Sequence, residues 1–226
     1  GLTMKKGLTE LVFILDRSGS MSGLENDTIG GFNGMIKKQR DEEGEANVTT
    51  VLFDHNIKTI HDGVNIKELS DMTSKDYYVG GSTALLDAIG STIKSVNKKQ
   101  KSLPEEEQAE KVIFVITTDG MENASCHYDR DKIKKMIEKK QSKKNWQFMF
   151  LGANMDAVSE AGRIGIRADR AVTYANDSYG VRENYAAVGG TISAMRCCAS
   201  PEAMSEVDDS CFEKVKAYAK KKLVQH

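Results

Sequence analysis

Short apolar segments alternate along the chain with segments whose apolar residues recur every three or four positions. The short segments predict strands, and three of them are apolar at almost every position, as is typical of parallel strands covered on both faces. The strand segments are 10–15, 47–53, 58–61, 111–117, 146–151 and 170–174. The segment at 58–61 follows a short turn-prone link, so we expect it to form a hairpin edge strand.

The intervening segments predict amphipathic helices, because their apolar residues would share one face of a helix. These apolar faces lie at 85–96, 133–137, 181–195 and 212–223. A further helix is expected after the first strand, and it contains Gly30, Gly31 and Gly34. Glycine inside a helix costs up to about 1 kcal/mol, so we expect close packing against the sheet at these positions.

The alternation of strands and helices, joined by short links, predicts an α/β fold. We expect a doubly wound, mostly parallel six-stranded sheet with one antiparallel edge strand and helices on both faces. The sequence contains no internal repeat, low-complexity tract or linker rich in proline, glycine or serine. One domain is therefore expected over 8–200, and 201–226 is expected to add an amphipathic helical extension packed on the same domain.

The charge of the chain narrows the classes of partner. Its 226 residues carry a formal net charge of −1, so there is no overall basic field to hold a nucleic-acid backbone, and no nucleic-acid partner is expected. Lysines cluster at 134–135, 139–140, 143–144 and 220–222. Their helical spacing favours solvent-exposed helix faces, with an acidic partner as the alternative interpretation.

Several features favour a cytoplasmic location. No run of about 18 apolar residues is present, so neither a membrane-spanning helix nor a membrane partner is expected. The first residues lead into a strand rather than into the apolar stretch of a signal peptide. The four cysteines, at 126, 197, 198 and 211, lack C-x-x-C spacing. We interpret them as reduced core thiols rather than as zinc ligands or disulfides.

Oxygen-bearing side chains follow or flank three of these segments. Asp16, Ser18 and Ser20 follow the first strand at alternate positions, the sequence Gly-Gly-Ser-Thr at 80–83 precedes a helix, and Asp119 follows the strand at 111–117. Doubly wound sheets bind ligands beyond the carboxyl ends of their strands, and hard cations such as Mg²⁺ prefer oxygen ligands. Taken singly, each segment is explained better by turn chemistry or, for Ser82 or Thr83, by helix capping. Their occurrence together at one sheet edge favours a divalent-metal site.

Other polar residues near these segments have weaker functional interpretations. Glu122 and Asn123 follow the third segment, where they would shape its rim or bond to its backbone. Asp87 is expected either to be solvated or to reach toward the metal loops. His127 lies next to Cys126, but adjacent side chains point apart in most backbone conformations, so we do not expect a catalytic pair.

Three motifs together resemble the von Willebrand factor type A (vWA) domain: ILDRSGSM at 14–21, GGSTAL at 80–85 and ITTDG at 116–120. The resemblance extends over about 8–196 and implies a Rossmann-like vWA fold with a metal-ion-dependent adhesion site (MIDAS). Transferred residue by residue, the implied metal ligands are Asp16, Ser18, Ser20, Thr83 and Asp119. Thr83 is preferred to its neighbour at 82 because it lies five residues before Ala88, which matches the family spacing.

The resemblance implies a divalent-metal-dependent protein-binding module that is not an enzyme. The implied cofactor is Mg²⁺ or Mn²⁺, with Ca²⁺ as a weaker alternative, and an Asp or Glu carboxylate of a protein partner would complete its coordination. Missing export and disulfide signals make the chain more similar to bacterial intracellular members than to adhesion proteins. The sequence identifies neither the partner nor the oligomeric state.

The rival hypothesis is a metal-dependent hydrolase or phosphotransferase on a similar fold. Such an enzyme would need a nucleophile or general base at the metal. A common phosphotransferase arrangement has a second Asp two positions after the first, where this chain has Ser18. Phosphate-binding and dinucleotide-binding glycine loops are also missing from the sequence.

Overall fold

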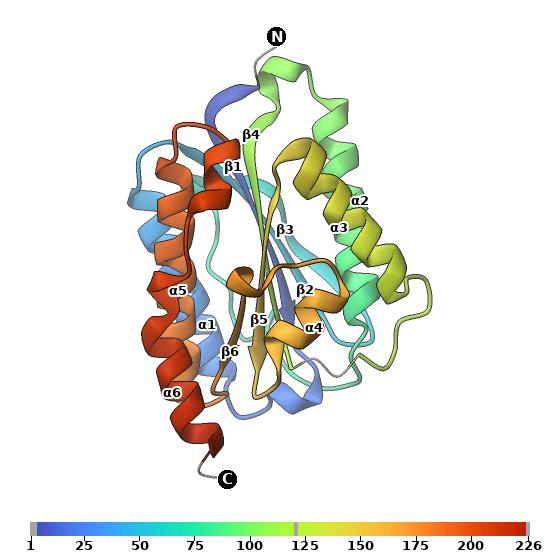
Figure 1. The fold of residues 1–226 in the computed structure, drawn as a ribbon, viewed down its shortest axis with the longest axis vertical. Coiled ribbons are helices and arrows are strands. Elements are labelled where there is room, and N and C mark those ends of the chain that lie inside the picture. The colour runs from blue at the N-terminus through green and yellow to red at the C-terminus, as the bar shows by residue number, and fades with distance from the viewer. Residues whose placement is uncertain (1–3, 120–121, 225–226) are drawn as a thin grey trace.

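The computed structural model describes residues 4–119 and 122–224. A six-stranded sheet lies at its centre, with the strand order β3-β2-β1-β4-β5-β6 (Figure 1). The strands are β1 (Lys5–Asp16), β2 (Glu45–Phe53), β3 (Ile57–Asn65), β4 (Ala109–Thr118), β5 (Gln147–Ala153) and β6 (Ala171–Tyr174). Strand β3 is antiparallel to β2, and the other neighbouring strands pair in parallel. The predicted sheet with one antiparallel edge strand is confirmed.

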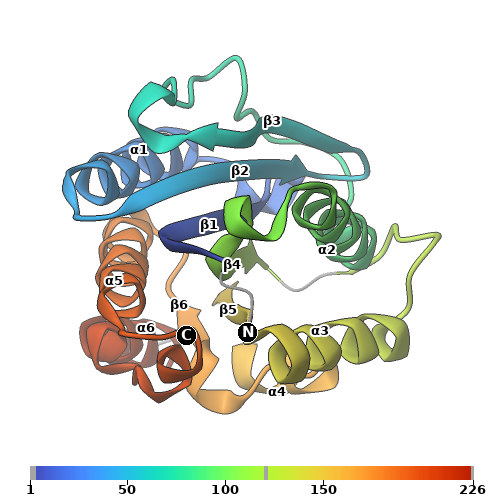
Figure 2. The same cartoon turned by 90° about the horizontal axis from the view of Figure 1, so that it is seen from above.

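Helices cover both faces of this sheet. The helices are α1 (Glu25–Asp41), α2 (Leu85–Ser102), α3 (Arg130–Lys144), α4 (Ala157–Arg163), α5 (Ser178–Cys197) and α6 (Glu213–Val224). Seen from above, α1, α5 and α6 lie on one side of the sheet and α2, α3 and α4 lie on the other (Figure 2). Helix α4 was not predicted, because its seven residues bury only two alanines and show no clear apolar period.

The continuous apolar runs of the central strands supply two separate cores. Along β1, the side chains of Leu11, Phe13 and Leu15 join the core under α1 and α5. The intervening Val12 and Ile14 join the core under α2 and α3. Successive side chains of a strand point to opposite faces, so a strand covered on both faces is apolar at most of its positions.

The glycines of α1 only partly match the prediction. A Cβ atom at Gly31 would lie 2.7 Å from Cδ2 of Tyr185, which comes from α5 rather than from the sheet. At Gly30 and Gly34 nothing lies within 4 Å of such an atom. Close packing therefore explains Gly31 alone, and the expectation that all three glycines pack on the sheet was wrong.

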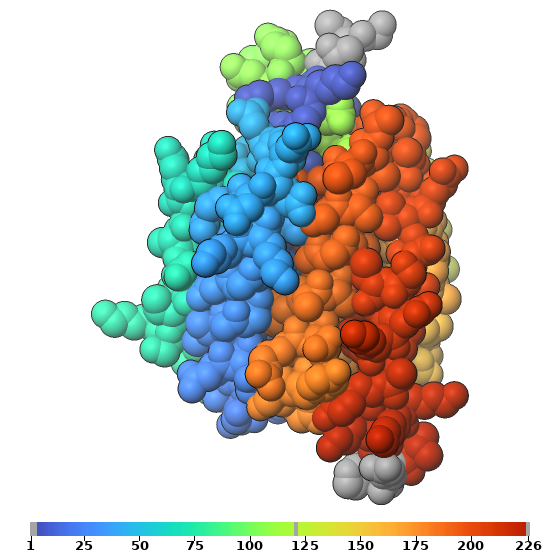
Figure 3. Space-filling view, turned by 90° about the vertical axis from the view of Figure 1, so that its left-hand side faces the viewer, coloured from blue at the N-terminus to red at the C-terminus, as the bar shows by residue number. Residues whose placement is uncertain are grey.

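The C-terminal segment lies against the face formed by α1 and α5. Helix α6 packs on α5 and β6, and α1, α5 and α6 lie side by side in the space-filling view (Figure 3). Phe212, Val215 and Ala219 are buried as their spacing predicted, whereas Leu223 is 40% exposed. Three of the four positions of the predicted apolar face are therefore part of the core.

The cysteines are free, as predicted, but they are not core residues. Cys126, Cys197 and Cys211 are exposed, and Cys198 is half-buried. Cys197 is the last residue of α5 and Cys198 is its C-cap. Both lie after Met195, the last buried residue of that helix, so neither belongs to its buried face. Within the two described ranges, no helix is long and apolar enough to cross a membrane.

Candidate metal centre

Asp16 lies at the carboxyl end of β1 and connects it to the end of β4. Its carboxylate is buried, and its Oδ1 accepts a hydrogen bond from the backbone N–H of Ser18 at 2.7 Å. Its Oδ2 accepts hydrogen bonds from Oγ1 of Thr118 at 3.0 Å and from the backbone N–H of Asp119 at 3.4 Å. One carboxylate therefore connects the loop after β1 to the loop after β4 and fixes their relative position.

The hydroxyl groups of the first loop extend this arrangement toward Asp119. Oγ of Ser18 lies 3.1 Å from Oγ of Ser20, and the Ser20 hydroxyl donates a hydrogen bond to Oδ2 of Asp119. Four of the five side chains predicted as ligands, Asp16, Ser18, Ser20 and Asp119, thus form one continuous group. We call this group the oxygen cluster.

The second loop is attached to the first by backbone hydrogen bonds. The N–H of Gly19 donates to the carbonyl of Gly81 at 3.1 Å, and the N–H of Gly80 donates to the carbonyl of Arg17 at 3.1 Å. Gly81 has a φ of +79°, and a Cβ atom there would lie 2.4 Å from Nδ1 of His55. The left-handed backbone conformation of Gly81 therefore favours glycine at this position, because L side chains rarely adopt it.

Thr83, the fifth predicted ligand, is buried at the same edge and is held by its backbone. Its N–H donates to Oδ1 of Asn123 at 2.8 Å, and its carbonyl accepts from the N–H groups of Asn123 at 3.0 Å and Ala124 at 3.1 Å. The segment at 122–124 is thereby attached to the second loop. Of the two expectations for Asn123, bonding to a loop backbone is the one observed, but the backbone belongs to the second loop.

Glu122 stabilises the start of α2. Its Oε1 accepts a hydrogen bond from the backbone N–H of Leu86 at 3.0 Å. The residue that caps α2 is Ala84, whose side chain makes no capping hydrogen bond. The interpretation of Ser82 or Thr83 as an ordinary helix cap was therefore wrong, because a side chain from the third loop provides the acceptor.

Asp87 anchors the chain after the third loop. Its buried carboxylate accepts hydrogen bonds from the backbone N–H groups of Cys126 at 2.8 Å, His127 at 2.9 Å and Tyr128 at 3.0 Å. Its own N–H donates to Oγ of Ser125 at 3.0 Å. Asp87 is buried rather than solvated, and it reaches the later part of the third loop rather than the oxygen cluster itself. Its acceptor role depends on residues about forty positions away, and no local pattern signals it.

Arg17 lies between Asp16 and Ser18 in the sequence, but its side chain contacts other segments, which include Asp54 and Asp76. Only 4% of its side chain is exposed, its Nη1 donates to the carbonyl of Asp76 at 2.9 Å, and its Nε lies 3.6 Å from Oδ2 of Asp54. The guanidinium lies over the ring of Tyr78 at 4.6 Å from the centroid. Beside it, the hydroxyl of Tyr77 donates to the carbonyl of Asp16 at 2.8 Å. The segment at 76–78 therefore clamps the first loop, a role that the sequence analysis missed.

The electrostatics of the oxygen cluster favour a cation. Burial raises the pKa of Asp16, and the neighbouring charge of Asp119 raises this pKa further, while hydrogen bonds from Ser18 and Thr118 oppose the shift. Two carboxylates share this site, so a divalent cation bound there would offset both the burial of the Asp16 charge and its repulsion by Asp119. In the described part of the chain, no three His, Cys, Asp or Glu side chains form a metal-holding group. A donor set of two carboxylates with neutral hydroxyls fits a hard cation that retains water, such as Mg²⁺.

The chain belongs to the von Willebrand factor type A domain family, because the sequence pattern of that family matches residues 10–185. No curated protein sequence matches the chain.

Solved structures share this fold at low sequence identity. The PilB minor pilin from Streptococcus sanguinis is 13% identical, with a TM-score of 0.58, and the alignment covers 89% of this chain and 63% of that one. Proximal thread matrix protein 1 from the mussel byssus is 14% identical, with a TM-score of 0.53 and coverages of 83% and 46%. A von Willebrand factor type A protein from Catenulispora acidiphila is 14% identical, with a TM-score of 0.53 and coverages of 83% and 42%. The chain thus spans less than two thirds of each of these relatives.

Proposed function

We propose that this chain is a divalent-metal-dependent protein-binding module, with Asp16, Ser18, Ser20, Thr83 and Asp119 as the residues that hold Mg²⁺ or Mn²⁺. The observation that carries the proposal is the oxygen cluster, in which side chains from the loops after β1 and β4 are in direct contact. These loops lie at the carboxyl ends of parallel strands, toward the lower end of the molecule in Figure 1, where doubly wound sheets bind ligands. Membership of the vWA family supports the same assignment.

The chemistry of the five residues suits binding rather than bond breaking. Three of them would bind the metal through uncharged hydroxyl oxygens. A bound metal would therefore keep enough Lewis acidity to accept an Asp or Glu carboxylate from a protein partner. The surrounding loops must then supply specificity, because any suitably placed carboxylate satisfies the metal. Ser18, at the position where a phosphotransferase would need a second Asp, contacts Ser20. Reproducible phosphoester turnover that disappears in Asp119→Ala would contradict a pure binding role.

Metal titration calorimetry tests the ligand set with variants that spare the fold. Ser20→Ala and Thr83→Val each remove one hydroxyl, and neither removes a backbone hydrogen bond. Each is expected to weaken Mn²⁺ binding about tenfold or more, since even indirect partners of a metal contribute about 10–100-fold. Ser22→Ala is the matched control, because this exposed serine follows the same loop. Equal affinity in all four proteins would overturn the ligand assignment.

Partner recognition is tested by affinity capture from the lysate of the source organism. Capture is compared for the wild type with Mg²⁺, the wild type with EDTA, and Thr83→Val with Mg²⁺. A metal-bridged partner is expected to be recovered in the first condition and largely lost from the other two. A partner recovered equally in all three conditions would exclude a metal-bridged contact and indicate an ordinary surface interface.

A further inference from the structure

A cleft of about 330 Å³ lies between the C-terminal halves of α2 and α3, which run side by side (Figures 1 and 2). Two apolar residues and one amide contribute to its lining, and six lysines supply the rest. The lining residues are Ile93, Lys94, Asn97, Lys101, Met136, Lys139, Lys140, Lys143 and Lys144. We call this feature the lysine cleft.

The lysines of the cleft occupy positions where facing helices usually place apolar side chains. On α2 the lining residues at 93, 97 and 101 recur every four positions, and on α3 those at 136, 140 and 144 do the same. Residues with this spacing share one face of a helix. Only Ile93 and Met136 are apolar, so lysines from two helices face one another across the cleft. Like charges four positions apart on one helix, as at 139/143 and 140/144, destabilise the folded protein unless something neutralises them.

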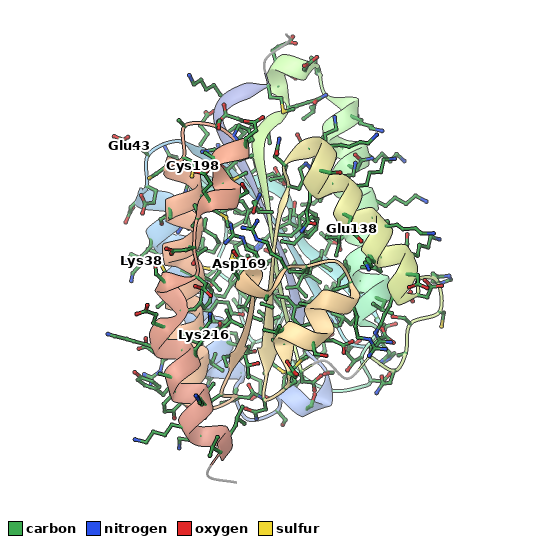
Figure 4. The ribbon with its side chains drawn as sticks, in the orientation of Figure 1. Lys38, Glu43, Glu138, Asp169, Cys198 and Lys216 are labelled. Atoms are coloured by element: carbon green, nitrogen blue, oxygen red, sulfur yellow. The ribbon has the colours of Figure 1, made fainter. Side chains whose placement is uncertain are left out.

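Carboxylates of the described chain do not neutralise this charge. None of the six ammonium groups forms an ion pair with an Asp or Glu of residues 4–119 and 122–224. Glu138, labelled in Figure 4, is the only acidic residue of α3 after its first turn. Its Cγ lies against Gly165, which follows α4, so it belongs to another side of α3. The chain as a whole has a net charge of −1, so the positive charge of the cleft is a local concentration.

Lys140 lies among these like charges. Its Nζ donates to Oδ1 of Asn97 and lies 5.0 Å from the ring centroid of Trp146. Burial lowers its pKa, and the positive charges of Lys101, Lys144 and Lys139 lower this pKa further. An anion in the cleft would remove the repulsion that these lysines exert on one another.

We propose that the lysine cleft binds a compact polyphosphate group. Six lysines line one small volume, and lysine binds phosphate as a compact point charge. A volume of about 330 Å³ is near the lower end for small-molecule sites, so it suits a phosphate chain better than a duplex or a helical peptide. Trp146 is buried and covered by Lys140, so the cleft offers no aromatic platform for a nucleobase.

The lysine cleft is separate from the oxygen cluster. Leu86, which Glu122 contacts, lies in the first turn of α2, whereas Asn97 lies about 16 Å further along this helix at 1.5 Å per residue. The proposal therefore does not depend on a metal at the other end of the helix. Binding can be measured without divalent cations, which would themselves associate with polyphosphate.

The test is calorimetric titration with inorganic tripolyphosphate at low ionic strength, with the full chain and EDTA. The variant Lys101→Gln/Lys140→Gln/Lys144→Gln removes three cleft charges, taken from both helices. It is expected to bind tripolyphosphate at least about tenfold more weakly than the wild type. Raising the salt concentration is expected to weaken binding to the wild type steeply, because the contacts are electrostatic.

The matched control is Lys98→Gln/Lys134→Gln/Lys135→Gln. It changes the net charge by the same amount on the same two helices, at exposed positions outside the cleft. Its affinity is expected to stay within about twofold of wild type. No saturable binding to the wild type, or an equal loss in both triple variants, would overturn the proposal, because the effect would then reflect overall charge.

Two sources could supply the polyphosphate group, a free phosphate chain and the tail of a nucleotide, and titrations with tripolyphosphate and ATP compare them. Affinity for ATP equal to or weaker than that for tripolyphosphate would support recognition of the phosphate chain, whether free or as the tail of a nucleotide, and clearly tighter binding of ATP would contradict the absence of a nucleobase platform. A polyglutamate peptide or a short DNA duplex that binds more tightly than both would overturn the proposal. Circular dichroism of each variant checks that the fold is retained.

Discussion

Replacing Gly31 by alanine is expected to destabilise the protein, although alanine is the better helix former. The added Cβ would lie 2.7 Å from Cδ2, 3.1 Å from Cγ and 3.2 Å from Cβ of Tyr185. These atoms lie at the base of a buried side chain, so a change of rotamer at Tyr185 cannot clear all of them. Helices α1 and α5 must therefore move apart, or the core around Tyr185 must repack.

Gly34 of the same helix supplies the matched control and is expected to respond in the opposite direction. Nothing lies within 4 Å of a Cβ built there, so Gly34→Ala should gain about 0.5–1 kcal/mol from helix propensity alone. Gly31→Ala gains the same propensity but pays an overpacking penalty of about 1–3 kcal/mol. We therefore expect Gly31→Ala to be less stable than Gly34→Ala by about 1–3 kcal/mol.

Urea unfolding followed by circular dichroism measures this difference directly. A protein of this size changes its Tm by about 2–4 °C for each kcal/mol, so thermal unfolding gives an independent check. The slopes of the urea transitions must agree between variants before free energies are compared. If Gly31→Ala is as stable as Gly34→Ala, the two helices are not held at the observed separation and the reasoning fails.

Three further predictions concern buried charge and thiol exposure. Burial raises the pKa of Glu10 from its usual 4.5, so the folded state favours the protonated acid and loses stability as the pH rises above that value. Glu10→Gln should remove this pH-dependent loss in urea unfolding, and parallel profiles would contradict the explanation. Asp87→Ala should destabilise by at least about 2 kcal/mol, because three backbone N–H groups lose their acceptor, whereas Asp71→Ala at an exposed position should have little effect. Ellman's reagent should react rapidly with three exposed thiols of the native protein, those of Cys126, Cys197 and Cys211. A reaction that needs denaturant would show that these thiols are buried.

The local sequence pattern was sufficient for the sheet and for much of the helical packing. The mostly apolar runs at 10–15 and 111–117 became the central strands β1 and β4, since strands covered on both faces favour apolar side chains at nearly every position. The turn-prone link after 47–53 correctly predicted an antiparallel edge strand. Asp16 and Asp119 each come at the end of a predicted parallel strand, which correctly predicted that they lie close together. Their role as metal ligands stays a prediction.

Interactions between distant segments could not be predicted from those patterns. Asp87 accepts from residues about forty positions later, and Arg17 contacts Asp76, 59 positions later. Gly31 is the only glycine of its group that a neighbouring helix requires, because only it faces Tyr185. The local sequence makes each of these positions suitable for solvent exposure or for packing, and the outcome depends on the partner that the fold supplies.

The sequence by itself determined the strands, most of the helix faces and the presence of oxygen-bearing side chains at one sheet edge, because these depend on residue type and on spacing along one element. Only the tertiary structure decided which elements became neighbours. It showed that third-loop side chains hold the start of α2, and that lysines of α2 and α3 line one cleft. The physical reason is that the energy of a polar or charged group depends on what surrounds it, and the surroundings of Asp87 or Lys140 come from distant parts of the chain.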